Sequence, residues 1–208
     1  MSTGSHRIPR EAIALLLLLG CSACTAARAP VVEADHIAEV LALHPGMWVA
    51  DVGAGNGEWT TDLADRVGEA GHIYSTEVDE DDVEKIREIV DSAGLTNVTT
   101  LLGQADDSGL PDDCCDAILL RLVYHHFTDP PEMRRSLYDA LRPGGRIAVI
   151  EIEPQSHWPE LSDVPDRGGH GIPAQDLIEE MTSQGFEVVE RHDPWEGHSD
   201  RYCVVFRR

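Results

Sequence analysis

The residues best suited to chemistry lie in the sequence VADVGAGNG at residues 49–57. A short apolar run ends at Asp51, and glycines follow at alternate positions as Gly53, Gly55 and Gly57. A strand, a glycine turn and a helix together bring backbone N–H groups and a helix N-terminus against a polar ligand. A dinucleotide-binding turn has the spacing G-x-G-x-x-G, but here Glu58 stands where the last glycine belongs. The loop therefore predicts a binding turn for a different ligand.

Polar side chains also follow three later strands of the expected fold. Glu77 ends the strand expected over 72–77, and its carboxylate can accept hydrogen bonds from both hydroxyls of a ribose. Residues 104–106, with the sequence QAD, follow the strand expected over 98–102 and offer a small residue and an acid to an adenine edge. Glu77 could also be one more solvated acid among 38, and Asp106 could be only a turn former or helix cap.

The sequence RLVYHHF at residues 121–127 follows the strand expected over 115–120. Histidine titrates near neutral pH, so His125 and His126 are candidate general bases. Tyr124 is a candidate for orienting a substrate. One sequence does not decide which histidine acts, and one of the two could be an ordinary polar residue. Past Cys21 and Cys24, no C-x-x-C pair or histidine spacing indicates a zinc site, so the sequence predicts no metal.

Strands and helices alternate along most of the chain. Strands are expected over 47–52, 72–77, 98–102, 115–120, 146–152, 185–191 and 202–207, and helices over 33–43, 58–67, 81–93, 131–141 and 175–183. This order predicts an α/β fold with a doubly wound, mostly parallel seven-stranded sheet. The last two strands have no helix between them, so they should form a C-terminal antiparallel hairpin. In such a sheet, ligands bind at the carboxyl ends of the strands.

The charge of the chain limits its partners. The 208 residues include 38 acidic and 16 basic ones, and the formal net charge is −22. A field this negative repels phosphate backbones, which argues against a nucleic-acid partner. Small cationic or neutral substrates remain possible. The alternative is that the charge serves solubility alone. The oligomeric state stays open.

The N-terminus has the pattern of an export signal. Arg7 and Arg10 precede the apolar run AIALLLLL at residues 12–19, and Gly20 and Cys21 follow. The sequence LLGC at residues 18–21 resembles a bacterial lipobox, whose cysteine is lipidated. We therefore expect residues 1–30 to be a signal and linker, and residues 31–208 to be the functional domain. The protein would be exported or anchored to a membrane through Cys21, or cytoplasmic if the leader is misassigned.

Six short motifs together indicate a family. They are DVGAGNG (51–57), GHIYSTE (71–77), GQAD (103–106), LPD (110–112), YHHF (124–127) and LRPGGR (141–146). Their order and spacing resemble those of small class I S-adenosylmethionine (SAM)-dependent methyltransferases over residues 33–208. The chain looks most like small bacterial methyltransferase-domain proteins. The resemblance implies a Rossmann-like fold and SAM as the cofactor.

The resemblance also assigns residues to the cofactor. The glycines of residues 53–57 would flank the methionine and ribose of SAM, Glu77 would hold the ribose, Val78 would pack on the adenine, and Ala105 with Asp106 would meet the adenine edge. The full expected set is Asp51, Gly53, Ala54, Gly55, Asn56, Gly57, Glu77, Val78, Gln104, Ala105, Asp106 and Arg121. Relatives often have aspartate where this chain has Gln104, and Glu77 is one methylene longer than the commoner aspartate.

Methyl transfer from a sulfonium needs little covalent help: the protein positions the acceptor and removes a proton. The irregular segment 154–172 lies where this fold builds its acceptor lid. His157, Trp158, His170 and Trp195 would shape the acceptor cavity, although both tryptophans could serve packing instead.

Two functions remain. The first is a SAM-dependent methyltransferase (EC 2.1.1.-) that acts on a small-molecule acceptor of unidentified structure. The alternative is an exported, lipid-anchored protein that binds SAM or a nucleoside without catalysis, which Cys21 favours because SAM is made in the cytosol. A nicotinamide oxidoreductase is disfavoured by Glu58 and by the two-stranded C-terminal ending.

Overall fold

The computed structural model describes Met1 and residues 31–159 and 161–208. The expected leader and Cys21 lie outside the described residues. The helices are α1 (Val31–Val40), α2 (Glu58–Val67), α3 (Glu80–Ser92), the 3-10 turn η1 (Tyr124–His126), α4 (Pro130–Ala140) and α5 (Ala174–Gln184). The strands are β1 (Trp48–Val52), β2 (His72–Glu77), β3 (Val98–Leu102), β4 (Cys115–Arg121), β5 (Leu141–Ile152), β6 (Glu187–His192) and β7 (Arg201–Arg207).

All seven strands form one sheet in the order β3-β2-β1-β4-β5-β7-β6. The pairs from β3 to β5 are parallel, whereas β7 runs antiparallel to both β5 and β6. The predicted mostly parallel sheet with a C-terminal antiparallel hairpin is therefore confirmed. The hairpin places its second strand inside the sheet, so β6 becomes the edge.

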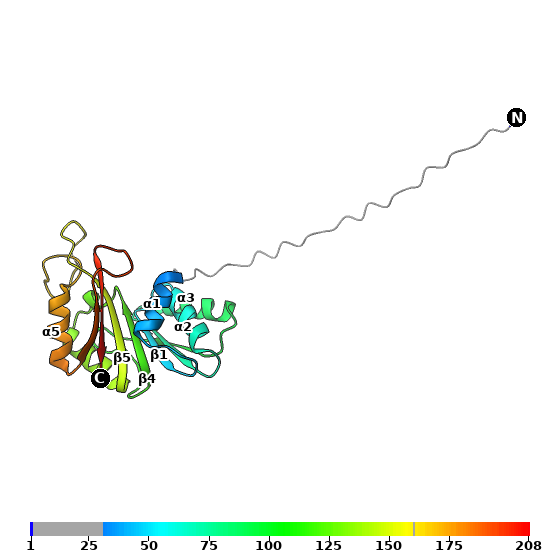
Figure 1. Cartoon of the computed structure of the whole chain (residues 1–208), viewed down its shortest axis with the longest axis horizontal. Coiled ribbons are helices and arrows are strands. Elements are labelled where there is room, and N and C mark those ends of the chain that lie inside the picture. Colours follow the sequence, from blue (N-terminus) through cyan, green and yellow to red (C-terminus); the bar gives the residue numbers. More distant parts are fainter. Residues whose placement is uncertain (2–30, 160) are drawn as a thin grey trace.

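Helices cover both faces of the sheet, and Figure 1 shows α5 on one side and α1, α2 and α3 on the other. Each face has its own buried apolar cluster. Leu137 of α4 and Leu177 of α5 belong to one cluster, and Ile37 of α1 and Leu63 of α2 belong to the other. Burial of these apolar faces is the main favourable term that holds a fold of this kind together.

Element boundaries follow local chemistry. Asp79 caps α3 by accepting hydrogen bonds from the backbone N–H groups of Asp81 and Asp82, so the helix begins at Glu80, one residue before the predicted start. The strand predicted from Arg146 begins instead at Leu141, because Leu141 pairs with Cys115 across an irregularity in the β4–β5 register. The RPGG sequence therefore lies within β5 and not in a free turn.

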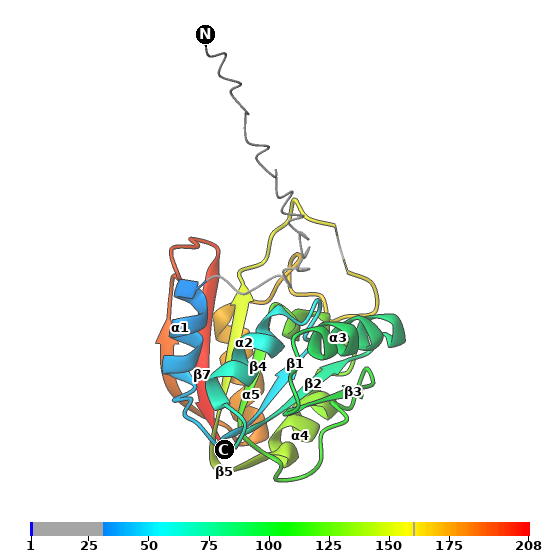
Figure 2. The ribbon, with the colours of Figure 1, turned by 90° about the vertical axis from the view of Figure 1, so that its right-hand side faces the viewer.

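The strand order reverses between β1 and β4, since β2 and β3 follow on one side of β1 and β5 on the other. The carboxyl ends of β1 and β4 thus diverge into a crevice, where ligands bind in sheets of this kind. Figure 2 shows the long connection from β5 to α5 arching beyond this edge of the sheet. Among the described residues, none of the helices combines the length and the apolar character needed to cross a bilayer.

Candidate functional site

A cavity of about 170 Å³ opens at the carboxyl ends of the strands. Its lining includes Gly53 after β1, Glu77 at the end of β2, Ala105 after β3 and His126 after β4. The four positions that the sequence singled out therefore meet at one place. Residues that the sequence analysis did not assign to the site complete the wall: Val52, Thr76, Gly103, Asp107, Ser108, Val123, Phe127, Thr128 and Met133. Most of them are apolar or small, and they became recognisable only once the loops were placed.

The glycines of the loop after β1 let neighbouring atoms approach the backbone closely. Gly53 has a φ of +71°, and a Cβ atom built on it would lie 2.3 Å from Cγ2 of Val123. Any side chain at this position would therefore have to displace Val123 as well as adopt an unfavourable backbone conformation. Gly57, with a φ of +72°, ends the turn and begins α2. Ala54 is buried, whereas Gly55 and Asn56 lie at the exposed tip of the loop.

Glu77 is held in place by backbone donors. The N–H of Gly55 donates to Oε1 of Glu77 at 2.7 Å, and the N–H of Val78 donates to Oε2 at 3.1 Å. Each carboxylate oxygen can accept a further hydrogen bond. The carboxylate is therefore oriented and still able to accept from two neighbouring hydroxyls. The side chain of Val78 is 63% exposed beside it, an unusual state for valine that suits packing on a flat apolar ligand.

Asp51 lies beneath the loop and is only 2% exposed. Oγ1 of Thr60 donates to Oδ2 of Asp51 at 2.7 Å and lies 2.8 Å from Oγ of Ser75. Burial raises the pKa of Asp51 to about 6, and the hydrogen bond from Thr60 partly opposes this rise. Asp51 thus joins β1 to α2 through Thr60; it does not line the cavity, and its contact with the cofactor stays a prediction.

The loop after β3 contributes differently from what we expected. Gln104 and Ala105 line the cavity as predicted, but Asp106 lines a neighbouring surface depression instead. Asp107 occupies the cavity wall, where its Oδ1 accepts hydrogen bonds from the N–H of Gly109 and from Oγ of Ser136, both at 2.9 Å. The acid that lines the cavity is therefore Asp107, one residue after the acid of the motif, and contact of Asp106 with the adenine stays a prediction.

Arg121 is occupied by an ion pair at the end of β4. Its Nε and Nη2 each lie 3.0 Å from an oxygen of Glu33 on α1, and its guanidinium lies 4.6 Å from the ring centroid of Trp59. Although burial opposes the shift, hydrogen bonding and charge from Arg121 hold the pKa of Glu33 below its usual value. Arg121 therefore contacts α1 and α2, and a direct contact with the cofactor stays a prediction.

The position of Trp195 differs from the one that the sequence predicted. Its side chain is buried, and its Nε1 donates to Oε1 of Glu33 at 3.1 Å. The ring packs in the apolar cluster that contains α1 and α2, on the face of the sheet opposite to α5. The prediction that Trp195 shapes the acceptor cavity is wrong, because its apolar ring and its N–H both find partners within the core.

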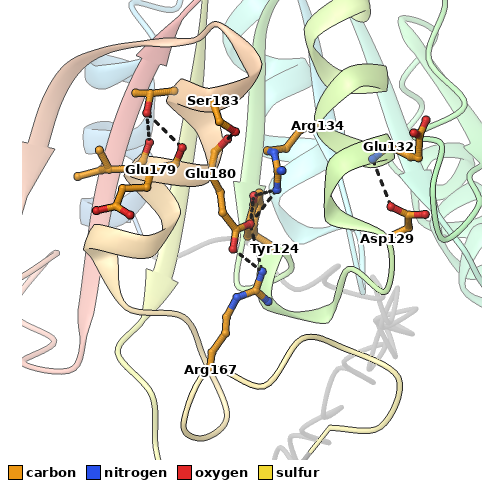
Figure 3. Close-up of polar contacts among 10 residues, drawn as sticks. Tyr124, Asp129, Glu132, Arg134, Arg167, Glu179, Glu180 and Ser183 are labelled. Carbon is orange, nitrogen blue, oxygen red and sulfur yellow. Dashed lines mark hydrogen bonds and ion pairs between the residues drawn. The ribbon is translucent and has the colours of Figure 1, made fainter.

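Tyr124 lies in a buried polar network that Figure 3 shows. Its hydroxyl donates to Oε2 of Glu180 at 2.7 Å and accepts from Nη1 of Arg134 at 3.0 Å. Arg167 also donates to Glu180 through Nη2, at 2.9 Å. Burial raises the pKa of Tyr124, and the charge of Glu180 adds to the rise. This placement favours a role for Tyr124 in joining α4 to α5 over contact with an acceptor.

The two predicted histidines meet a third. His125 Nε2 lies 3.1 Å from His170 Nε2, and the ring centroid of His126 lies 4.2 Å from that of His125. The Nδ1 of His125 lies 2.6 Å from Oε2 of Glu151, a carboxylate with no exposed surface. We call His125, His126 and His170 the histidine cluster. Burial, and then the charge of His125, lower the pKa of His126, which favours its neutral form.

The sequence analysis named all three histidines but missed Glu151. A signal existed, because Glu151 is the one charged residue in the apolar run IAVIEI that ends β5. A carboxylate buried in the middle of a sheet needs a partner, and His125 supplies it.

The described parts of the segment 154–172, residues 154–159 and 161–172, lie beside the histidine cluster. Gln155 and His170 pair across an isolated β-bridge, and the ring of Trp158 lies 5.1 Å from that of His170. A second cavity, of about 410 Å³, opens within the segment between residues such as Trp158 and Arg167. His157 is exposed and lines neither of these two cavities. The segment therefore encloses a space of its own, which Trp158 and Arg167 border.

Comparisons with known proteins show the family of the chain and proteins that share its fold. Residues 43–197 match the family described as methyltransferase domain. The ubiquinone/menaquinone biosynthesis C-methyltransferase UbiE of Vibrio vulnificus strain YJ016 is 32% identical over 109 residues, which are 52% of this chain and 42% of that protein. The chain thus spans less than half the length of this curated relative.

Two solved structures share the fold. A SAM-dependent methyltransferase from Aquifex aeolicus is 24% identical, with a TM-score of 0.69 over 83% of this chain and 88% of the other. The [4+2]-cyclase SpnF is 20% identical, with a TM-score of 0.70 over 84% of this chain and 80% of the other. Since one of these two is described as a cyclase, the fold by itself does not define the reaction.

Proposed function

The chain belongs to the methyltransferase-domain family, and from this premise we propose that it transfers a methyl group from SAM to a small-molecule acceptor held beside the histidine cluster. The observation that carries the proposal is the position of His126. Its side chain lines the same cavity as Glu77 and Gly53, so a proton acceptor lies within the space expected to hold the cofactor.

The residues of the cavity fit the adenosyl part of SAM. Glu77 presents two oriented carboxylate oxygens to the ribose hydroxyls, and Val78 and Ala105 offer small apolar surfaces to the adenine. Gly53 lets the backbone approach the rest of the cofactor, because a side chain there would meet Val123. Asp51 beneath the loop adds negative charge near a cationic ligand.

When bound, SAM supplies a methyl carbon on a positively charged sulfur, which becomes a neutral thioether as the C–S bond breaks. The chain has to hold the acceptor in line with that bond and to remove the acceptor's proton. The lowered pKa of His126 favours the neutral ring, which has a nitrogen lone pair that can accept the proton. The buried pair of Glu151 and His125 holds the neighbouring ring in position.

We place the acceptor in the cavity of the segment 154–172, next to Trp158. The curated relatives include a ubiquinone/menaquinone biosynthesis C-methyltransferase and a demethylmenaquinone methyltransferase. The present chain matches less than half of their length, so their acceptor is not carried over. An acceptor with an acidic O–H, N–H, S–H or C–H group suits proton removal by the cluster.

A binding protein without catalysis is the second candidate, because the lipobox-like sequence at residues 18–21 would place the chain away from cytosolic SAM. We propose export and attachment through a lipid on Cys21. Replacement of Cys21 by Ser should release the protein from membranes in cell fractionation. Unchanged fractionation of that variant would contradict lipidation.

Two measurements on the purified protein separate the candidates. Isothermal titration with SAM and with S-adenosylhomocysteine tests the cofactor site, and transfer of labelled methyl groups from SAM into a small-molecule extract tests catalysis. We expect His126→Gln to keep S-adenosylhomocysteine binding and to lose methyl transfer. Wild-type protein that binds the cofactor but never transfers its methyl group would support the binding protein. Absence of cofactor binding to the wild type would overturn both.

A further inference from the structure

The histidine cluster has the arrangement of a metal site. We propose that His125, His126 and His170 bind one divalent cation of the kind that prefers imidazole nitrogen, such as Zn²⁺, at the acceptor edge of the cofactor cavity. The three candidate ligand nitrogens lie within 4.8 Å of one another. The sequence predicted no metal, because His170 lies 45 residues after His125 and belongs to a different segment.

In His125 and His170, the hydrogen bond made by one ring nitrogen determines whether the other nitrogen is free to bind a metal ion. His125 Nδ1 lies 2.6 Å from a carboxylate oxygen of Glu151, and His170 Nδ1 lies 3.1 Å from the carbonyl oxygen of Pro159. Both partners accept hydrogen bonds, so each Nδ1 carries the hydrogen. In the neutral rings, each Nε2 is then left with a free lone pair.

These two Nε2 atoms face each other at 3.1 Å. Two lone pairs at this distance repel unless a positive charge lies between them, either a shared proton or a metal ion. A shared proton needs only two nitrogens. The third imidazole, His126, is therefore the observation that favours a metal ion.

The spacing suits a small cation. Nitrogen ligands about 2.0–2.1 Å from a tetrahedral zinc ion lie about 3.3 Å from one another. The pair formed by His125 and His170 is already close to this distance. The side chain of His126 is partly buried but keeps an exposed part, so rotation about its side-chain bonds can complete the set with little repacking.

The surroundings of the cluster supply what a metal site needs beyond its ligands. A histidine ligand usually donates its other ring N–H to a carboxylate or a carbonyl oxygen, which fixes the ring and raises its basicity. Glu151 does this for His125, and Pro159 does it for His170. The buried charge of Glu151 also offsets part of the charge of a cation.

Three protein ligands leave a fourth position for water or a substrate atom, which is the arrangement of catalytic zinc sites. Since His126 also lines the cofactor cavity, that position lies next to the expected methyl donor. This role rests on the proposed function. In the metal-loaded protein the histidines are ligands, and the cation lowers the pKa of a coordinated acceptor hydroxyl or thiol, whose proton passes to solvent.

The experiment titrates Zn²⁺ into the metal-free full chain by calorimetry, and Co²⁺ by visible absorption, in the absence of SAM. We expect one site per chain with micromolar or tighter affinity, and the intense absorption of four-coordinate Co²⁺. His170→Ala and His126→Ala should each abolish the site. Glu151→Gln keeps the shape of the buried side chain and should weaken Zn²⁺ binding about 10- to 100-fold as a positioning residue. His44→Ala, an exposed histidine beyond the opposite end of β1, is the control and should bind Zn²⁺ like the wild type.

The outcomes separate this proposal from the proposed function. Absence of Zn²⁺ and Co²⁺ binding, or binding that survives His170→Ala, overturns the metal site. S-adenosylhomocysteine binding measured on the same preparation tests the cofactor site alone. Nitrogen chemical shifts of the histidine rings provide a second readout: signals from a proton shared by His125 and His170, unchanged by added Zn²⁺, would also overturn the metal site.

Discussion

The backbone N–H of Gly55 donates a 2.7 Å hydrogen bond to Oε1 of Glu77, which ties the loop after β1 to the end of β2. This contact joins the two halves of the expected cofactor site, together with backbone hydrogen bonds from the N–H groups of Gly53 and Ala54 to the carbonyl oxygen of Thr76. Glu77 is oriented by the loop that it is expected to complete, so a change at either residue should affect the same ligand.

Replacement of Glu77 by Ala should weaken S-adenosylhomocysteine binding by at least about tenfold, because hydrogen bonds to a charged group contribute about 1.5–3 kcal/mol. Isothermal titration measures the change. Glu69→Gln, which alters an exposed acid after α2, is the matched control and should bind like the wild type. Equal affinity of the Glu77 variant and the control would remove Glu77 from the site.

Replacement of Gly53 by Ala should abolish cofactor binding. The added Cβ would meet Val123 at 2.3 Å, and the backbone has a positive φ. Gly46→Ala is the control, because Gly46 also has a positive φ, of +92°, but a Cβ there meets nothing within 4 Å. Both variants should lose about 1 kcal/mol of stability from backbone strain, and Gly53→Ala should lose more because Val123 must also move. Only Gly53→Ala should also lose binding, and intact binding would contradict the loop assignment.

Stability should depend on pH through Asp51. Its pKa in the folded protein is about 6, above its ordinary value of 3.8, so the folded state holds the proton more tightly. The contribution of Asp51 to the free energy of unfolding is therefore most favourable below pH 3.8. About 3 kcal/mol of this contribution is lost as the pH rises to about 6. Asp51→Asn removes this dependence and keeps an acceptor for Thr60. Urea unfolding of both proteins between pH 4 and about 7 should show the variant gaining relative stability as pH rises. A constant difference would contradict the assignment.

The ion pair between Glu33 and Arg121 should stabilise the fold. Glu33→Gln leaves the Arg121 guanidinium without its charged partner, and loss of one partner of a buried pair costs about 3–5 kcal/mol. Thermal unfolding should show a clear decrease in the midpoint temperature. Glu39→Gln, on an exposed position of the same helix, should leave it nearly unchanged. If the two variants have similar midpoints, the pair does not stabilise the fold.

Tyr124 should affect stability more than catalysis. Tyr124→Phe removes the hydroxyl that bridges Glu180 and Arg134, and we expect a loss of about 1–3 kcal/mol. Cofactor binding and methyl transfer should persist, in contrast to His126→Gln. If Tyr124→Phe lost methyl transfer but kept its stability, the result would instead support contact between Tyr124 and the acceptor.

Much of the fold was readable from local patterns. The limits predicted for α2, β2 and β3 are those observed, because glycines and strand-forming runs define their ends. The predicted antiparallel ending was confirmed as well. The start of β5 was not readable, since Leu141 joins the sheet through pairing with Cys115, which is a contact between distant segments.

The sequence by itself determined the sheet, the glycine loop and the acid at the end of β2, because each depends on residues that are neighbours along the chain. Only the tertiary structure decided which polar groups meet. It placed Asp107 in the cavity wall instead of Asp106, paired Arg121 with Glu33, buried Trp195, and set His170 against His125 above a buried Glu151. These contacts join segments that are far apart in sequence, and no periodicity or spacing within one segment encodes them.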